Sequence, residues 1–257
     1  MKTCILVMVK DEQEYLGDFL KYHLDLGIDE IYVFEDVRSA SHRETADRCP
    51  GVELHSIKDI VADAYKVRSR AHFQTAYIKE CLTWIKERSD CDWCFVLDCD
   101  EFITTDGCGL EVLGEYAGYD AVMLQWRNYG CSGHMEKPVY DRPIWEIYTE
   151  ECGYTEFDQR GGFIQKVCYN MKTLKRENIC SNHFTKGNWV KTDLSRNLRE
   201  VCYDRMYLRH YITKSLEEYR WKLEKRGMIY PGHRSMKDFW EMQPKYAGLF
   251  NKKKEEE

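Results

Sequence analysis

The 257-residue sequence lacks several features that would each define a class of protein. No stretch approaches the roughly 18 to 20 consecutive apolar residues that a membrane-spanning helix requires. The first apolar run covers only Cys4 to Val9, too short for a signal peptide, and no small-residue cleavage site follows it. No internal repeat and no linker rich in Pro or Ser divides the chain. We therefore expect one cytoplasmic domain over residues 1–250 and a charged tail at 251–257.

Cysteine is abundant, with twelve residues, but its arrangement does not indicate a disulfide framework. Several cysteines, such as Cys4 and Cys94, lie in apolar runs, where reduced thiols serve as small hydrophobic side chains. Cys91 and Cys94 form a CxxC pair, but no second pair at zinc-binding spacing accompanies it. We expect reduced thiols and no structural zinc.

The net charge of −6 conceals two regions of opposite sign. Residues 1–159 carry 16 Lys and Arg against 32 Asp and Glu, whereas residues 160–227 carry 16 against 7. An acidic half that faces a basic segment suits a metal ion and an anionic ligand held between them. Two other interpretations are a solvated basic surface and peripheral docking on the inner face of an anionic membrane. No groove-reading motif is present, so nucleic acid is not an expected partner.

The apolar pattern predicts alternating strands and helices. Strands are expected at 3–9, 30–36, 52–57, 93–97 and 120–126, and helices at 15–24, 67–88 and 216–223. A strand, a helix and a second strand in succession form a βαβ unit, which predicts an α/β fold with a mostly parallel central sheet flanked by helices. Ligands of such sheets bind beyond the carboxyl ends of the strands. The polar residues at three of these ends should therefore converge on one crevice; they are Lys10 and Glu12, Glu35 and Asp36, and Asp98 and Asp100.

The most informative segment is WCFVLDCDEFI at residues 93–103, an apolar strand that runs into three carboxylates. In an extended chain Asp98 and Asp100 point to the same side, while Cys99 points away. Two carboxylates on one side can clamp a divalent cation, and Mg²⁺ or Mn²⁺ suits oxygen ligands and leaves positions for phosphates. The alternative is a capped loop in which the acids accept backbone N–H groups. We expect the metal site.

The same segment and several others, in order along the chain, resemble nucleotide-sugar glycosyltransferases of the GT-A fold. They are VKDE and YLGDFLKYH within residues 9–23, QTAY and CL within 74–82, LDCDEFI at 97–103, W and YGCSGH within 126–134, and HYITKSLEEY and RG within 210–227. The pattern resembles glycosyltransferase family 92 and the family 2-like group, which share a DxDEF motif. The chain departs from it at Asp11, where an Asn is usual, and at Lys79 and Glu80, where an Asn or Asp often precedes Cys-Leu. The QxxRW motif of processive polymer synthases is absent.

The resemblance implies a role for individual residues. Asp98, Asp100 and His210 would hold Mn²⁺ or Mg²⁺, with His183 as the alternative third ligand. The donor-binding residues would be Lys10, Glu12, Glu35, Asp36, Gln74, Asp98, Lys214 and Ser215, with Lys214 on the diphosphate. Within the domain, a nucleotide-binding half at about 1–105 would precede a half at about 106–230 that completes the metal site and binds the acceptor.

An inverting transfer also needs a general base for the acceptor hydroxyl. Glu101, His134, Glu146 and His183 are four open candidates. Trp126 and Tyr129 would either stack on a sugar or pack in the core.

The sequence therefore predicts a metal-dependent, inverting transfer of a sugar from a UDP-sugar to a glycan or lipid-linked acceptor. Two other functions are compatible with it: a non-catalytic nucleotide-binding scaffold of the same fold, and a phosphatase with a nucleophilic first Asp. The phosphatase motif normally reads DxDGT on an early strand, whereas here Glu101 and Phe102 follow the aspartates and several elements precede them.

Overall fold

The computed structural model describes residues 1–36, 41–61, 70–153, 165–226 and 235–246. Its strands are β1 (Thr3–Val9), β2 (Glu30–Glu35), β3 (Val52–Ser56), β4 (Trp93–Leu97), β5 (Glu101–Thr105), β6 (Ala121–Asn128), β7 (Gln165–Asn170), β8 (Trp189–Lys191) and β9 (Met206–His210). Its α-helices are α1 (Gln13–Asp25), α2 (Arg43–Asp47), α3 (Ile57–Ile60), α4 (Arg70–Lys86), α5 (Ile144–Ile147), α6 (Leu216–Trp221) and α7 (Met236–Glu241). Each of the predicted strands and helices has a counterpart among them.

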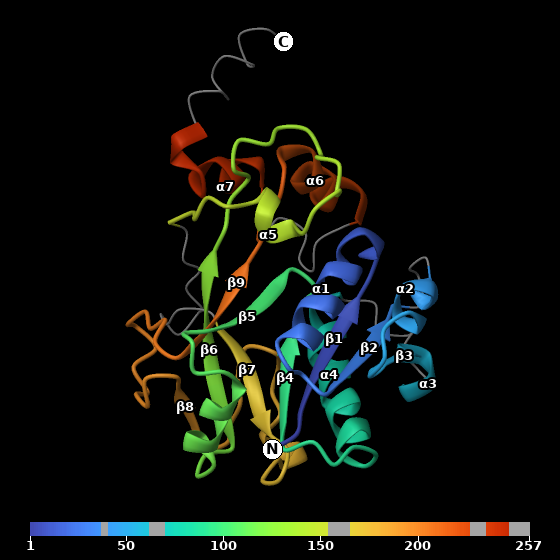
Figure 1. Ribbon diagram of the computed structural model, residues 1–257, viewed down its shortest axis with the longest axis vertical. Coiled ribbons are helices and arrows are strands. Elements are labelled where there is room, and N and C mark those ends of the chain that lie inside the picture. Colours follow the sequence, from blue (N-terminus) through green and yellow to red (C-terminus); the bar gives the residue numbers. More distant parts are fainter. Residues whose placement is uncertain (37–40, 62–69, 154–164, 227–234, 247–257) are drawn as a thin grey trace, which may run out of the picture.

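The strands form one sheet in the order β3-β2-β1-β4-β7-β6-β9-β5, with β8 on β6. β1 to β4 are mutually parallel, β7 runs antiparallel between β4 and β6, and β5 runs antiparallel to β9. Figure 1 shows the parallel strands rising from the N-terminus toward the end of the molecule where α5, α6 and α7 gather. The predicted α/β fold with a mostly parallel sheet flanked by helices is confirmed.

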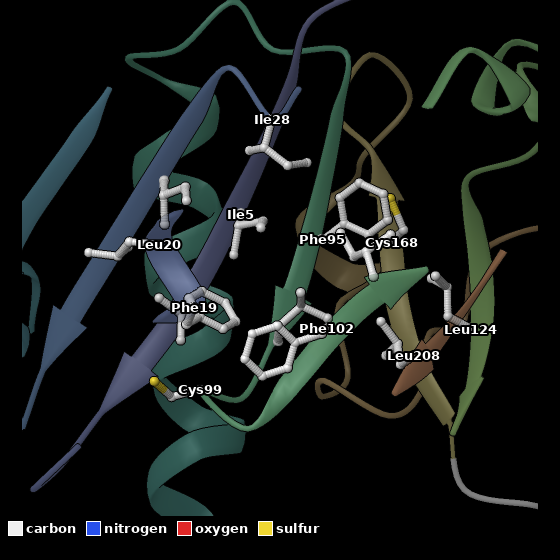
Figure 2. Packing of buried hydrophobic residues seen from close by; sticks show 14 of the residues in the cluster. Ile5, Phe19, Leu20, Ile28, Phe95, Cys99, Phe102, Leu124, Cys168 and Leu208 are labelled. Atoms are coloured by element: carbon white, nitrogen blue, oxygen red, sulfur yellow. The ribbon is translucent and has the colours of Figure 1, made fainter. Parts of the chain in front are cut away.

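Hydrophobic side chains fill both faces of the sheet. One core contains Leu16, Phe19 and Leu20 of α1 together with residues of β1 and β4, and Figure 2 shows Phe95 beside Cys168 of β7 in this core. The other core contains Ile78, Cys81 and Leu82 of α4. A third, smaller cluster joins α6 and α7 to the loop after β6. Helices thus cover both faces of the sheet. Beyond its carboxyl edge lie α5, α6, α7 and the loop after β6, which we call the cap.

The end of α1 follows from local sequence. Gly27 adopts φ = 101°, the left-handed conformation typical of the residue after a helix, and the N–H groups of Gly27 and Ile28 donate to Leu24 and His23 carbonyls. His23 is fully buried in the last turn. Its Nδ1 donates to the Phe19 carbonyl at 2.8 Å, and its Nε2 accepts the Ile103 N–H at 3.2 Å, so the imidazole joins α1 to β5.

All twelve cysteines are free thiols in the structure. Cys4 Sγ and Cys91 Sγ are 2.8 Å apart at the amino edge of the sheet, remote from the strand ends that carry the carboxylates. Among the residues that the structure describes, no helix combines the length and the apolar character that a membrane span requires.

Burial of His23 makes stability depend on pH. Desolvation lowers its pKa from 6.5 to about 3 in the folded chain, so the unfolded chain binds more protons between these values. The free energy of unfolding should therefore fall as the pH drops below 6.5, and His23 should account for about 2 kcal/mol of that loss at pH 5. Urea unfolding of His23→Gln should show this contribution missing, whereas His55→Gln, at a partly exposed histidine, should follow the wild-type curve. Parallel curves for His23→Gln and wild type would contradict the assignment.

Candidate functional site

A tight turn at the carboxyl end of β4 brings the predicted metal ligands together. The Glu101 N–H donates to the Asp98 carbonyl at 3.1 Å, so the chain reverses directly from β4 into β5. β5 pairs with β9, which places Glu101 opposite His210, and the Tyr211 N–H donates to the Asp100 carbonyl at 2.9 Å. The pairing thus brings Asp100 and His210, which are 110 residues apart in the sequence, close together at the edge of the sheet where Asp98 also lies.

Asp98 is paired with a lysine that the sequence reasoning missed. Lys166 of β7 is fully buried, and its Nζ lies 2.5 Å from Asp98 Oδ2 and 3.3 Å from Glu101 Oε2. Burial alone would raise the pKa of Asp98, but the Lys166 ammonium more than offsets this and holds that pKa below its usual value. Asp98, whose side chain is partly exposed, and the fully buried Lys166 therefore form an ion pair.

Glu101 is enclosed beneath the turn. It is 0% exposed, its Oε2 accepts the Asp98 N–H at 2.9 Å, and its Oε1 has no hydrogen-bond partner among the described residues. Burial raises the pKa of Glu101 well above its usual value despite the nearby Lys166, which favours the neutral acid. A neutral Glu101 beside ionised Asp98 and Lys166 leaves this buried group of three without net charge. These contacts indicate that Glu101 stabilises the turn between β4 and β5.

Asp100 has a different environment, with cations on one oxygen and an imidazole on the other. Its Oδ2 lies 3.3 Å from Lys214 Nζ and 3.5 Å from Lys222 Nζ. Its Oδ1 lies 3.7 Å from His210 Nε2, farther than a hydrogen bond. No role for Lys222 was predicted from the sequence.

His210 has the hydrogen bonding of a metal ligand. Its Nδ1 lies 3.0 Å from Asn128 Oδ1, an acceptor, so Nδ1 carries a proton, and Nε2 faces Asp100. Ligating histidines commonly have their other ring nitrogen fixed in this way. Asp100 Oδ1 and His210 Nε2 therefore fit two ligands of one Mn²⁺ or Mg²⁺. Within the described ranges, no three His, Cys, Asp or Glu side chains form a complete metal site, so substrate oxygens or water would have to supply the rest.

The ends of β1 and β2 are joined by His42, another residue that the sequence reasoning missed. The His42 Nδ1 donates to Glu35 Oε1 at 2.8 Å, and its Nε2 accepts the Glu12 N–H at 3.1 Å. The Asp36 N–H donates to the Val9 carbonyl at 3.0 Å. Glu12, Glu35 and Asp36 thus lie on adjacent strand ends, as predicted. Lys10 follows β1 directly, in the same loop as Glu12.

The remaining candidates lie at varied distances from the turn. His183 is close enough to Lys166 and Asp98 to be affected by both, and burial lowers its pKa to about 4. Trp126 packs between His183 and His210, with ring centroids at 5.4 and 4.3 Å, rather than projecting into open space.

The other four candidates belong to the cap or to α4. His134 lies in the loop after β6, with its ring 5.6 Å from that of Tyr148. Glu146 is exposed on α5, near Asp18 of α1. Ser215 is fully buried as the N-cap of α6. Gln74 lies in α4, in a part whose side chains fall outside the described residues.

Comparison with known proteins gives one match over nearly the whole chain. The model of glycosyltransferase family 92 matches residues 3–247. No curated protein matches.

Two of the solved structures that the chain resembles are distant. Glucosyl-3-phosphoglycerate synthase from Mycobacterium tuberculosis, in complex with Mn²⁺, UDP and glucosyl-3-phosphoglycerate, is 12% identical, with a TM-score of 0.35 over 49% of this chain and 44% of that chain. The bifunctional IspDF from Campylobacter jejuni is 10% identical, with a TM-score of 0.40 over 78% of this chain and 52% of that chain. The chain thus spans about half or less of the length of these proteins, and likeness at this level says nothing about activity.

The buried position of Lys166 predicts a large cost for its removal. Lys166→Met should lower the free energy of unfolding by about 1.5 to 3 kcal/mol, because Asp98 and Glu101 lose their buried charged hydrogen-bond donor. Lys172→Met is the matched control, since Lys172 pairs with Asp92 at 2.6 Å but is 73% exposed, and it should cost less than about 1 kcal/mol. Denaturant unfolding compares the two. An equally small loss of unfolding free energy in both variants would show that Lys166 does not offset the charge of Asp98.

Proposed function

The chain belongs to glycosyltransferase family 92, and on this premise we propose that it transfers a sugar from a UDP-sugar to a glycan or lipid-linked acceptor with the help of a divalent cation. The observation that carries the proposal is the arrangement around Asp100. Its Oδ1 faces Nε2 of His210, and its Oδ2 faces the ammonium groups of Lys214 and Lys222. A carboxylate and an imidazole suit a divalent cation, and two ammonium groups suit a diphosphate.

The position of the two lysines supports this use of the site. Both lie within 3.5 Å of one oxygen of Asp100, which is only 8% exposed. A pair of ammonium groups at one place is suited to the oxygens of a diphosphate. We infer that Lys214 and Lys222 bind the diphosphate of the donor, while Asp100 and His210 hold the cation beside it. A bound Mn²⁺ or Mg²⁺ would stabilise the negative charge that develops on the leaving diphosphate.

Other residues fit supporting roles. Asp98, fixed by Lys166 and by its own backbone contact with Glu101, presents a carboxylate to the donor or to the cation. Glu12, Glu35 and Asp36 offer acceptors for hydroxyl and base N–H groups of the nucleotide. His42 would orient two of them through its contacts with Glu35 and the Glu12 backbone.

The general base is proposed among the candidates that an acceptor can reach. Glu101 is completely enclosed, so its role would be to support the turn. His134, Glu146 and His183 remain, and an inverting reaction requires one of them to accept the hydroxyl proton. A variant of the true base should keep nucleotide binding and lose turnover.

The proposed site predicts cooperative binding of metal and nucleotide. UDP with Mn²⁺ should raise the melting temperature of the wild type more than either alone, because each completes the binding site of the other. Asp100→Asn should abolish the joint shift, whereas Asp106→Asn, at an exposed aspartate at the far end of β5, should keep it. Differential scanning fluorimetry measures both. A wild type that shows no joint shift would contradict the proposal, and binding without turnover of any donor would favour the non-catalytic scaffold.

A further inference from the structure

A buried carboxylate lies where the cap meets α1, and hydroxyl groups surround it. Glu218 of α6 is 8% exposed and accepts hydrogen bonds from the hydroxyls of Tyr15, of Tyr140 at 2.6 Å, of Tyr148 at 2.7 Å and of Ser215 at 2.6 Å. The Ser215 N–H also donates to it, at 3.1 Å. We call these five residues the Glu218 cluster. Among the residues that the structure describes, no lysine, arginine or histidine forms an ion pair with Glu218.

The pattern of hydrogen bonds suits an ionised carboxylate. The Ser215 hydroxyl accepts the Glu218 N–H at 3.2 Å and donates to the Glu218 carboxylate. The Tyr148 hydroxyl accepts the Ser215 N–H at 3.1 Å and likewise donates to the carboxylate. Burial would raise the pKa of Glu218, but the surrounding hydrogen bonds outweigh it and lower that pKa. An amide at this position would turn an NH₂ group toward donors.

The residues that donate hydrogen bonds to Glu218 come from separate parts of the chain. Tyr15 belongs to α1, which follows the first strand of the sheet, while Tyr140 and Tyr148 flank α5 in the cap. Ser215 is the N-cap of α6 and forms a capping box with Glu218. A single carboxylate therefore fastens two segments of the cap to the first helix of the nucleotide-binding half. Figure 1 shows α5 and α6 above the carboxyl end of β1, where α1 begins.

Lys214 depends on this arrangement through two contacts. Its Nζ lies 4.3 Å from the centroid of the Tyr15 ring and 3.3 Å from Asp100 Oδ2. Its backbone has φ = 55°, a left-handed conformation that a residue other than glycine adopts only when its surroundings hold it there. Ser215, the next residue, is fixed by Glu218 through both its hydroxyl and its N–H. The Glu218 cluster thus determines the position of the Lys214 backbone and of the ring beneath its ammonium group.

We propose that Glu218 is a positioning residue for the diphosphate of the donor: by fixing Tyr15 and the start of α6, it holds Lys214 beside Asp100. The inference rests on the proposed function, and it adds a residue that touches neither nucleotide nor metal. Glu218 acts through Lys214, so its loss should weaken the recognition of the terminal phosphate and leave the nucleoside contacts at β1 and β2 intact.

The test compares the affinities for UDP and UMP, each in the presence of Mn²⁺, by isothermal titration calorimetry. Glu218→Gln should lower the ratio of UDP to UMP affinity about tenfold, because a charge-assisted contact to the terminal phosphate is lost. Glu217→Gln is the matched control. Glu217 is the preceding residue on the same helix, it is exposed, and its carboxylate accepts the Lys137 N–H at 2.8 Å. It should leave the ratio unchanged.

Tyr15→Phe provides a second variant that keeps the ring beneath Lys214 and removes only the hydroxyl, and it should lower the ratio about threefold. If Glu218→Gln fails to fold, as judged by circular dichroism, Tyr15→Phe decides the question. Equal losses of UDP and UMP affinity, or no loss, would overturn the positioning role while leaving the proposed function standing. A wild type that binds neither nucleotide would instead overturn the proposed function, and this inference with it.

Discussion

The site depends on one electrostatic constraint, which is that carboxylates at the end of a buried strand require positive charge close by. β4 is buried along its whole length and delivers Asp98, Asp100 and Glu101 to the carboxyl edge of the sheet. Desolvation and mutual repulsion would destabilise these groups as three anions. The fold meets the constraint in two ways, with Lys166 between Asp98 and Glu101 and with Lys214 and Lys222 at Asp100. The second arrangement places two ammonium groups at one carboxylate oxygen, where the proposed diphosphate would bind.

The distribution of charge along the chain has the same origin. Residues of the basic segment form ion pairs with the acidic half at several separate places. These pairs are Lys166–Asp98, Lys172–Asp92, Arg176–Glu80, Arg205–Glu115 and Lys214–Asp100. Two lysines of this segment, Lys166 and Lys191, are fully buried. Part of the positive charge of the segment therefore lies inside the molecule.

Local patterns were sufficient to predict the first half of the fold. Continuous apolar runs gave β1, β2 and β4, and the spacing of Leu16, Phe19 and Leu20 gave α1. β5, β7, β8 and β9 were not predicted, because each carries charged residues that interrupt the apolar pattern, such as Lys166 in QKVCYN and Arg209 in MYLRH. Their partners lie far away in sequence, so only tertiary contacts make these segments strands.

The site shows the same division. Asp98, Asp100 and His210 were expected to lie together, and the pairing of β5 with β9 brings them together. The enclosed position of Glu101 could not be predicted, since it depends on a lysine 65 residues later in the sequence. The available signal for Lys166 was a lone lysine in a mostly apolar segment. The Glu218 cluster had no local signal, because the tyrosines that bind Glu218 lie far from it in the sequence. Long-range pairs of this kind are determined by packing rather than by any motif.

The central claim is that this edge of the sheet binds and activates a nucleotide-sugar. The most direct measurement is the release of UDP from a panel of UDP-sugars in the presence of Mn²⁺, with wild type and Asp100→Asn side by side. The account predicts that at least one donor is hydrolysed or its sugar transferred by the wild type, and that this turnover is lost in the variant. A folded wild type that releases UDP from no donor, or a variant as active as the wild type, would contradict it.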